Sequence, residues 1–145
     1  MTIAIVYWSG TGNTRIMAET IRNTLAGNDI TVSLRDVSTV QTADILKADA
    51  LALGCPAMGA EELEESEMEP FVAGLIEQGI SGKPMLLFGS YDWGDGEWMR
   101  NWEDRMRKAG ANILASGLIS HNAPDDTTLE NLRDAAAKLV ESSRI

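Results

Sequence analysis

Residues 3–14 read IAIVYWSGTGNT, an apolar run that passes directly into a turn rich in glycine, hydroxyl and amide side chains. The apolar part is typical of a buried strand, and the residues after it open a helix. Gly10 and Gly12 permit a tight turn, so backbone amides of the helix start and polar side chains of residues 9–14 converge on one point. The stretch therefore predicts a strand, a phosphate-binding loop and a helix in succession.

The same loop argues against two common nucleotide sites. It has no lysine or arginine, which a triphosphate-binding loop supplies in a Gly-x-x-x-x-Gly-Lys pattern, and it lacks the Gly-x-Gly-x-x-Gly dinucleotide spacing. A dianionic monophosphate held by neutral donors fits better than a triphosphate. The structural alternative is a turn that only caps the helix.

Further apolar runs alternate with helix-like segments along the rest of the chain. The strand candidates are residues 3–8, 30–34, 48–55, 84–90 and 112–119. The first, third and fourth are almost continuously apolar, as expected of strands buried on both faces of a sheet. Helix patterns cover residues 13–26, 43–46, 67–78 and 96–109, and a final segment with Leu129, Leu132, Ala136 and Leu139 that runs nearly to Ile145.

This alternation predicts an α/β fold, because right-handed crossovers leave few other topologies. We expect a single domain over residues 1–145, with a doubly wound, five-stranded parallel sheet and helices on both faces. Ligands of such sheets bind beyond the carboxyl ends of the strands, where the strand order reverses. The loops after strands one, three and four should therefore form the site.

The composition limits the function further. The 12 lysines and arginines against 22 aspartates and glutamates give a net charge of -10, which opposes binding to nucleic acid or to an anionic membrane. We expect neither a signal peptide nor a membrane span. The single cysteine, Cys55, excludes an internal disulfide, favours the cytoplasm and leaves too few ligands for a metal site.

The negative charge is concentrated in one segment. No basic residue occurs between Lys47 and Lys83, while glutamate occupies positions 61, 62, 64, 65, 67 and 69. The plain interpretation is a solvated loop and a first helical turn, since acids suit helix N-termini. The functional interpretation is a negative surface that steers basic partners.

Three loops together resemble the FMN-binding loops of the flavodoxin family. Residues 9–14, SGTGNT after Tyr7 and Trp8, are similar to the phosphate loop. Residues 55–61, CPAMGAE, and residues 89–96, GSYDWGDG, look like the two loops that hold the isoalloxazine ring in short-chain flavodoxins. The likeness extends over the whole chain in the same order. Flavodoxins are themselves an example of the ligand position stated above.

The resemblance implies the flavodoxin-like strand order 2-1-3-4-5 and one non-covalently bound FMN. Met58 would pack on the inner flavin face and Trp93 would cover the outer face, since a thioether and an indole suit a flat, polarizable ring. Backbone amides near residues 90–92 and the Glu61 carboxylate would meet the polar pyrimidine edge. The phosphate would be held by Ser9, Thr11, Asn13 and Thr14. The complete expected set is Ser9, Gly10, Thr11, Gly12, Asn13, Thr14, Pro56, Ala57, Met58, Gly59, Ala60, Glu61, Ser90, Tyr91, Asp92, Trp93 and Gly94.

The resemblance also implies a low-potential one-electron carrier, not an enzyme, whose FMN cycles mainly between semiquinone and hydroquinone. The peptide at Gly59 would rotate on reduction and turn its carbonyl toward N5–H, which glycine allows at low cost. The glutamates of residues 61–69 would disfavour the anionic hydroquinone, within the limits of solvent screening. The implied partners are proteins with basic docking surfaces, such as reductases and low-potential electron acceptors, which meet this protein as a monomer.

Two positions depart from the family pattern. Pro56 stands where close relatives often have serine, so one hydroxyl directed toward the phosphate is missing. Ala60 stands where they often have aspartate or another polar residue. A type II turn through Gly59 and Ala60 needs a positive φ at Ala60, which alanine resists. We therefore expect less semiquinone than in an Ala60→Gly variant.

Other functions fit the sequence less well. An FMN-dependent quinone or nitro reductase needs room for a substrate over the flavin, which an aromatic lid at Trp93 would occupy. A phosphoacceptor signalling domain needs acids where Ser9 and Cys55 stand. A flavin-binding module without redox partners stays open, although the Gly59 turn argues against it. We interpret the remaining candidates as structural, with His121 a solvated loop residue and Cys55, Trp98 and Trp102 in the core.

Overall fold

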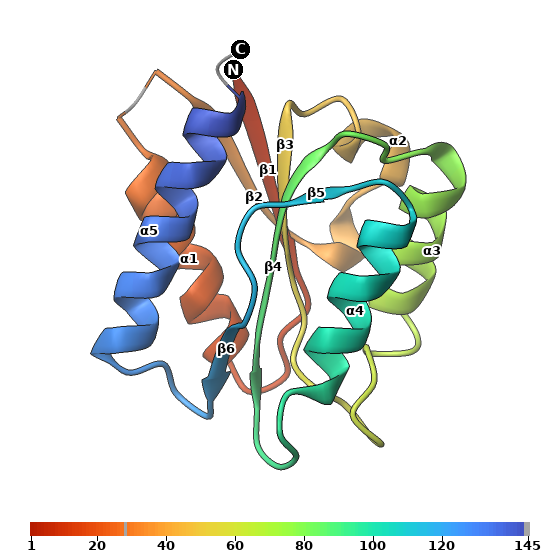
Figure 1. Ribbon diagram of the computed structural model, residues 1–145, viewed down its shortest axis with the longest axis vertical. Coiled ribbons are helices and arrows are strands. Elements are labelled where there is room, and N and C mark those ends of the chain that lie inside the picture. The colour runs from red at the N-terminus through yellow and green to blue at the C-terminus, as the bar shows by residue number, and fades with distance from the viewer. Residues whose placement is uncertain (28, 144–145) are drawn as a thin grey trace.

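A parallel sheet forms the centre of the protein in a computed structural model, which describes residues 1–27 and 29–143. Its strands follow the order β2-β1-β3-β4-β5, with β6 also paired to β4 (Figure 1). This order confirms the predicted fold. The strands are β1 (Thr2–Tyr7), β2 (Thr31–Asp36), β3 (Ala50–Gly54), β4 (Pro84–Tyr91), β5 (Asn112–Ile113) and β6 (Leu118–His121).

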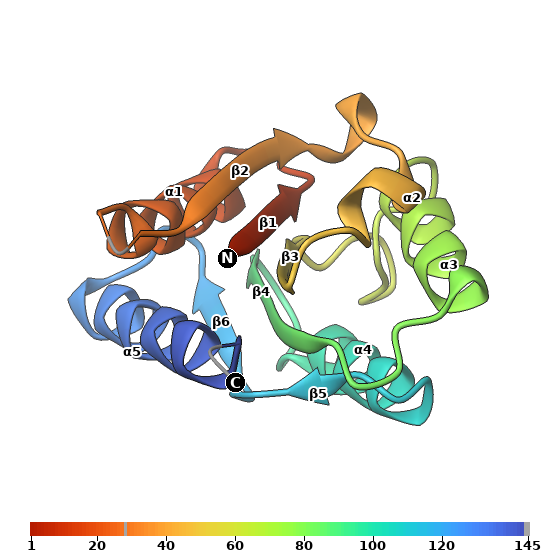
Figure 2. The same cartoon turned by 90° about the horizontal axis from the view of Figure 1, so that it is seen from above.

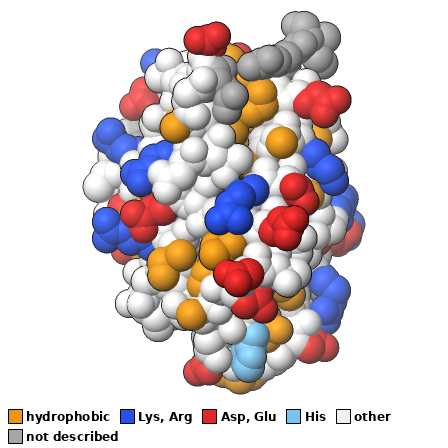
Figure 3. Space-filling view, turned by 90° about the vertical axis from the view of Figure 1, so that its left-hand side faces the viewer, with side chains coloured by type: hydrophobic (Ala, Val, Ile, Leu, Met, Phe, Trp, Pro, Cys, Tyr) orange, Lys and Arg blue, Asp and Glu red, His pale blue; other side chains and the backbone are white. Residues whose placement is uncertain are grey.

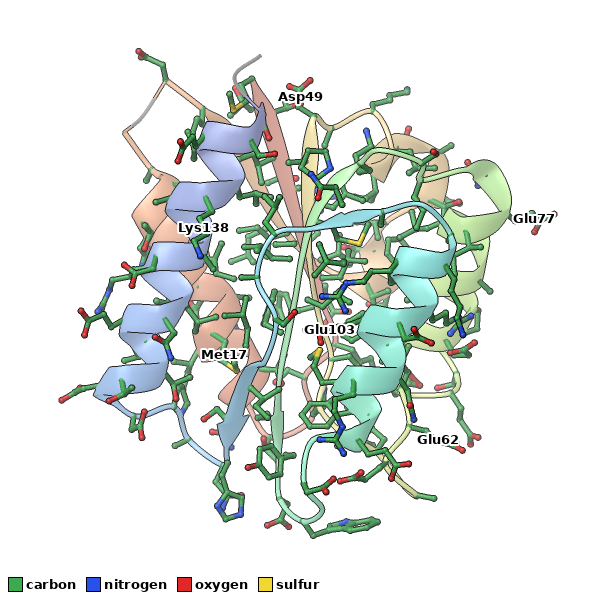
Figure 4. The ribbon with its side chains drawn as sticks, in the orientation of Figure 1. Met17, Asp49, Glu62, Glu77, Glu103 and Lys138 are labelled. Atoms are coloured by element: carbon green, nitrogen blue, oxygen red, sulfur yellow. The ribbon has the colours of Figure 1, made fainter. Side chains whose placement is uncertain are left out.

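The expected fifth strand is divided into β5 and β6. β5 pairs with the start of β4, and β6 pairs with its carboxyl end, where Phe88 lies opposite Leu118. Leu114 still donates its N–H to Met85 O at 3.1 Å, and residues 115–117 leave the sheet. Gly117 has a φ of 70° and its N–H donates to the buried Glu103 carboxylate at 3.0 Å, so helix α4 (Glu97–Lys108) holds this connection instead of the strand ladder (Figure 4).

Helices cover both faces of the sheet, as predicted (Figure 2). One face carries α1 (Asn13–Leu25) and α5 (Asp126–Ser143), and the other carries α3 (Met68–Gln78) and α4 (Glu97–Lys108). The short helix α2 (Thr42–Ile45) follows a 3₁₀ turn at Val37–Thr39 and lies beside α3. The expected end of the last helix near Ile145 lies outside the described residues. Among the described residues, no helix combines the length and the apolar character needed to cross a membrane.

The core consists of two apolar layers, one on each side of the sheet. Met17, Ile21 and Leu25 of α1 are fully buried on one side. Trp98 and Trp102 of α4 are buried on the other, which confirms both as core residues. The four-residue spacing of these side chains puts them on one helix face, where burial of each contributes about 1.5–3 kcal/mol. β1, β3 and β4 are buried almost throughout, as their continuous apolar runs predicted.

Candidate functional site

The carboxyl ends of β1, β3 and β4 meet at one edge of the sheet, at the bottom of Figure 1. The loops after these strands enclose a cleft of about 280 Å³. Ala57 N–H donates to Ser90 O at 3.0 Å, so the loop after β3 is fastened directly to β4. The predicted residues that line the cleft are Gly10, Thr11, Asn13, Pro56, Ala57, Met58, Ser90, Tyr91 and Asp92.

The loop between β1 and α1 forms a tight turn at the place where the sequence predicted a phosphate-binding loop. Gly12 has a φ of 97°, in the left-handed region, and its N–H donates to Ser9 Oγ at 3.0 Å. Thr14 is buried, and its hydroxyl lies 3.0 Å from Ser90 Oγ and accepts the Ser90 N–H at 3.3 Å. Thr14 therefore joins the start of α1 to the end of β4 from the buried side of the loop.

Residues 58–62 form a small hairpin beside the cleft. Met58 and Glu62 exchange two backbone hydrogen bonds, each 2.8 Å long. The positive φ values fall at Gly59 (52°) and Glu61 (54°), and not at Ala60. The turn in this conformation is therefore not a type II turn with a positive φ at Ala60, since the left-handed residues stand on either side of Ala60. The expected effect of Ala60 on the semiquinone stays a prediction.

The Glu61 carboxylate lies between the two loops expected to hold the flavin ring. It is 9% exposed, and its Oε1 accepts the Asp95 N–H at 2.8 Å. Gly94, with a φ of 91°, passes so close to this carboxylate that a side chain there would overlap it. One carboxylate oxygen is thus committed to the loop after β4, and Glu61 ties that loop to the 58–62 hairpin.

The two expected ring contacts differ in exposure. Met58 is half-buried and lines the cleft, and with Trp8 it also lines a second cleft of about 380 Å³. Trp93 is 61% exposed in the turn between β4 and α4 and does not line the cleft in this structure. The exposure of Trp93 fits a side chain that closes over a ligand, and it excludes a place in the core.

The sequence interpretation missed two residues of the cleft. Trp8 was quoted only as the end of the first strand, and Asn122 follows β6 with a φ of 63°. Asn122 could have been found from its place before Ala123, Pro124 and an aspartate, because asparagine tolerates left-handed turns. Trp8 carried no signal that separates it from a core tryptophan.

Cys55 is a buried core residue at the end of β3, as expected. Its side chain is inaccessible to solvent, and burial raises the pKa of the thiol to about 12, with the Glu64 and Glu69 charges adding to the effect. The neutral thiol accepts the Glu64 N–H at 3.4 Å. At such a pKa the thiolate is a negligible species at neutral pH, so Cys55 fills space and carries no nucleophilic role.

A sequence model of a protein family, described as Flavodoxin, matches residues 5–136. The chain belongs to the flavodoxin family. It is 51% identical over 122 residues to a flavodoxin of Clostridium beijerinckii, covering 84% of this chain and 88% of the relative. It is 42% identical over 139 residues to a flavodoxin of Megasphaera elsdenii, covering 94% and 98%. The solution structure of the two-electron reduced Megasphaera elsdenii flavodoxin matches with a TM-score of 0.84 at 42% identity, over 94% of this chain and 98% of that one.

As a flavodoxin, the protein is a flavin-based electron carrier. The cleft of this flavodoxin suits such a ligand at both ends. Trp8, Met58 and Tyr91 supply apolar and aromatic walls for a flat ring, while Thr11 and Asn13 supply neutral donors beside the start of α1. The residues that are present therefore fit a ring joined to an anionic tail.

Proposed function

We propose that this protein holds one FMN non-covalently in the cleft and transfers single electrons at low potential, between the one-electron-reduced and the fully reduced flavin. The observation that carries the proposal is the meeting of the three loops around one cleft at the sheet edge. A bound flavin supplies the reversible one-electron chemistry that side chains lack. The protein binds, orients and shields it.

The phosphate would lie at the start of α1. We assign it to Ser9, Thr11, Asn13 and Thr14, together with the backbone amides of the first helical turn. Four helix N–H groups have no partner inside a helix, and the helix dipole favours an anion there. Because no basic side chain is present in residues 9–14, the site suits a monophosphate that is held by hydrogen bonds.

The ring would lie between Met58 and Trp93. Met58 already lines the cleft, and the exposed Trp93 needs only a movement of the residue 92–95 turn to cover the outer face. Each contact contributes roughly 0.5–1.5 kcal/mol beyond the area that it buries. Glu61 would meet the polar edge of the ring with the oxygen that Asp95 does not use.

The low potential would arise from backbone freedom and negative charge. Gly59 lies at a φ of 52° with open space around its Cα, so its peptide can rotate to present a carbonyl to the ring. The glutamates of the 61–69 segment disfavour the added negative charge of the fully reduced flavin. We propose that the carrier acts as a monomer in the cytoplasm and meets reductases and low-potential acceptors through their basic docking surfaces.

The test is an anaerobic stepwise reduction of the purified protein loaded with FMN, followed by visible absorption. We expect a blue, neutral, one-electron-reduced flavin to accumulate before full reduction. Riboflavin, which lacks the phosphate, serves as the matched ligand and should bind at least about tenfold more weakly if residues 9–14 hold that group. Reduction in a single two-electron step would favour a quinone or nitro reductase, and no flavin binding would refute the proposal.

A further inference from the structure

The end of β6 holds the loop that follows β4. Asn122 donates its backbone N–H to Tyr91 O at 2.8 Å, and His121 Nε2 lies 2.9 Å from Asp92 O. The His121 ring also packs against the Tyr91 ring, with centroids 5.1 Å apart and planes at 35°. The carbonyl groups of the last residue of β4 and of the residue after it are thus bound by the last residue of β6 and the residue after it. The His121 side chain is exposed to solvent although its ring is hydrogen-bonded. Figure 3 shows the histidine, in pale blue, at the lower end of the molecule.

The contact with Asp92 defines where His121 carries its hydrogen. A carbonyl oxygen only accepts hydrogen bonds, so Nε2 carries the hydrogen in both the neutral and the charged ring. His121 is therefore the donor in this hydrogen bond and Asp92 O is the acceptor.

The bound carbonyl groups determine the direction of the amides that follow them. A trans peptide unit is planar, so its N–H points opposite to its C=O, and none of the described peptide bonds is cis. The bonds to Tyr91 O and Asp92 O therefore set the directions of the Asp92 and Trp93 N–H groups. Within the described residues, neither of these amides donates to a protein acceptor, and Asp92 lines the cleft.

We propose that His121 is a positioning residue for the cofactor, which orients the amides after β4 toward the polar edge of the flavin. The inference rests on the flavin function proposed above. The hydrogen bond from His121 to Asp92 O sets the direction of the Trp93 amide, and the neighbouring Asn122 N–H does the same for the Asp92 amide through Tyr91 O.

Two variants separate hydrogen-bond donation from ring packing. His121→Gln keeps an N–H near the position of Nε2 but lacks the ring, whereas His121→Ala removes both the donor and the ring. The dissociation constant of FMN, followed by flavin fluorescence, should rise about fivefold in His121→Ala, as expected for one lost hydrogen bond. It should stay within about twofold of the wild-type value in His121→Gln. Asn131→Ala, exposed on α5, is the control and should bind as the wild type does.

A second readout needs no flavin. NMR order parameters of the Asp92 and Trp93 amides should fall in His121→Ala and hold in His121→Gln, because only the alanine variant releases the Asp92 carbonyl.

Equal FMN affinity and equal amide order in wild type and His121→Ala would overturn the proposal. So would a glutamine variant that binds as weakly as the alanine variant, because packing on Tyr91 and not donation would then be the cause. A wild-type protein that binds no FMN would refute the proposed function itself, a result that differs from both.

Discussion

Glu61 and Gly94 illustrate how a residue takes its conformation from a partner in another loop. Glu61 adopts a φ of 54°, unusual for a residue with a side chain, while its carboxylate accepts the Asp95 N–H at 2.8 Å. Gly94 has a φ of 91° and leaves the space that this carboxylate occupies. The strained backbone at Glu61 is therefore offset by a hydrogen bond that forms only because residue 94 lacks a side chain.

We expect Gly94→Ala to destabilise the protein and to weaken FMN binding. Alanine is strained at this left-handed φ, and its methyl group would overlap the Glu61 carboxylate. The free energy of unfolding should therefore fall by about 1–3 kcal/mol in urea titrations. Gly82→Ala is the matched control, since Gly82 also has a positive φ (76°) but nothing within 4 Å of an added Cβ. Its loss should be limited to the backbone cost of about 1 kcal/mol. Equal losses in both variants would show that the contact with Glu61 is unimportant.

At the scale of elements, two buried glutamates hold backbone amides that the helices and strands leave unpaired. Glu64 lies just before α3 and accepts the N–H groups of Ser66 (2.6 Å), Glu67 (3.0 Å) and Met68 (3.3 Å). Glu103 of α4 accepts the Gly117 N–H between β5 and β6. Each carboxylate accepts a hydrogen bond from a backbone N–H that has no partner within a strand pair or a helix. A buried charge is tolerated when it is hydrogen-bonded in this way.

We expect Glu64→Gln to remove a pH-dependent part of the stability. Burial raises the pKa of Glu64, but hydrogen bonds from Ser66, Glu67 and Met68 outweigh this and hold the pKa below its usual 4.5. The stabilisation is therefore present above about pH 4.5 and is lost as the pH falls through the lowered pKa of the folded state. Above pH 4.5 the variant should lose about 1 kcal/mol in denaturant titrations. Its difference from wild type should shrink in acid, and the exposed Glu65→Gln should show no such trend.

We expect Glu103→Ala to loosen the connection between β5 and β6. Removal of the carboxylate leaves the Gly117 N–H without its acceptor, at a cost of about 1–3 kcal/mol in the free energy of unfolding. Hydrogen exchange of the Gly117 amide should quicken more than that of the sheet amides. Asp104→Ala, which removes only an exposed ion pair with Lys108 at 2.9 Å, should cost less than about 1 kcal/mol. A slow Gly117 amide in the alanine variant would contradict this role of Glu103.

At the scale of the whole molecule, only some glutamates of the 61–69 segment are available to attract a basic partner protein. Glu61 and Glu64 are committed to backbone amides, and Glu69 pairs with Arg105 at 2.8 Å. Glu62, labelled in Figure 4, and Glu65 are exposed and line the second cleft beside Met58, and Glu67 is partly exposed. In a protein with a net charge of -10, this group is the part of the 61–69 segment available for long-range attraction.

We expect a triple change of Glu62, Glu65 and Glu67 to glutamine to slow reduction by a basic reductase, mainly at low salt. Screening at about 10 Å in 0.1 M salt should reduce the difference from wild type as ionic strength rises. The control is an equal loss of charge on α5, at Glu130, Asp134 and Glu141. If both triple variants slow equally, total charge and not its position determines the rate.

The local pattern of the chain was enough to predict the parallel sheet, the helix positions and the three loops that enclose the cleft, because apolar runs, helical spacing and glycine-rich turns are features of adjacent residues. The strand order came from the family resemblance of those loops. The local pattern did not show the division of the fifth strand, the backbone angles at Ala60 and Glu61, or the contacts of His121 and Asn122. Each of these depends on a partner far along the chain: Glu103 for Gly117, Asp95 for Glu61, and the Tyr91 and Asp92 carbonyls for the end of β6. Such hydrogen bonds form to the backbone groups that the folded sheet leaves unpaired. The periodicity of the sequence does not indicate which groups these are.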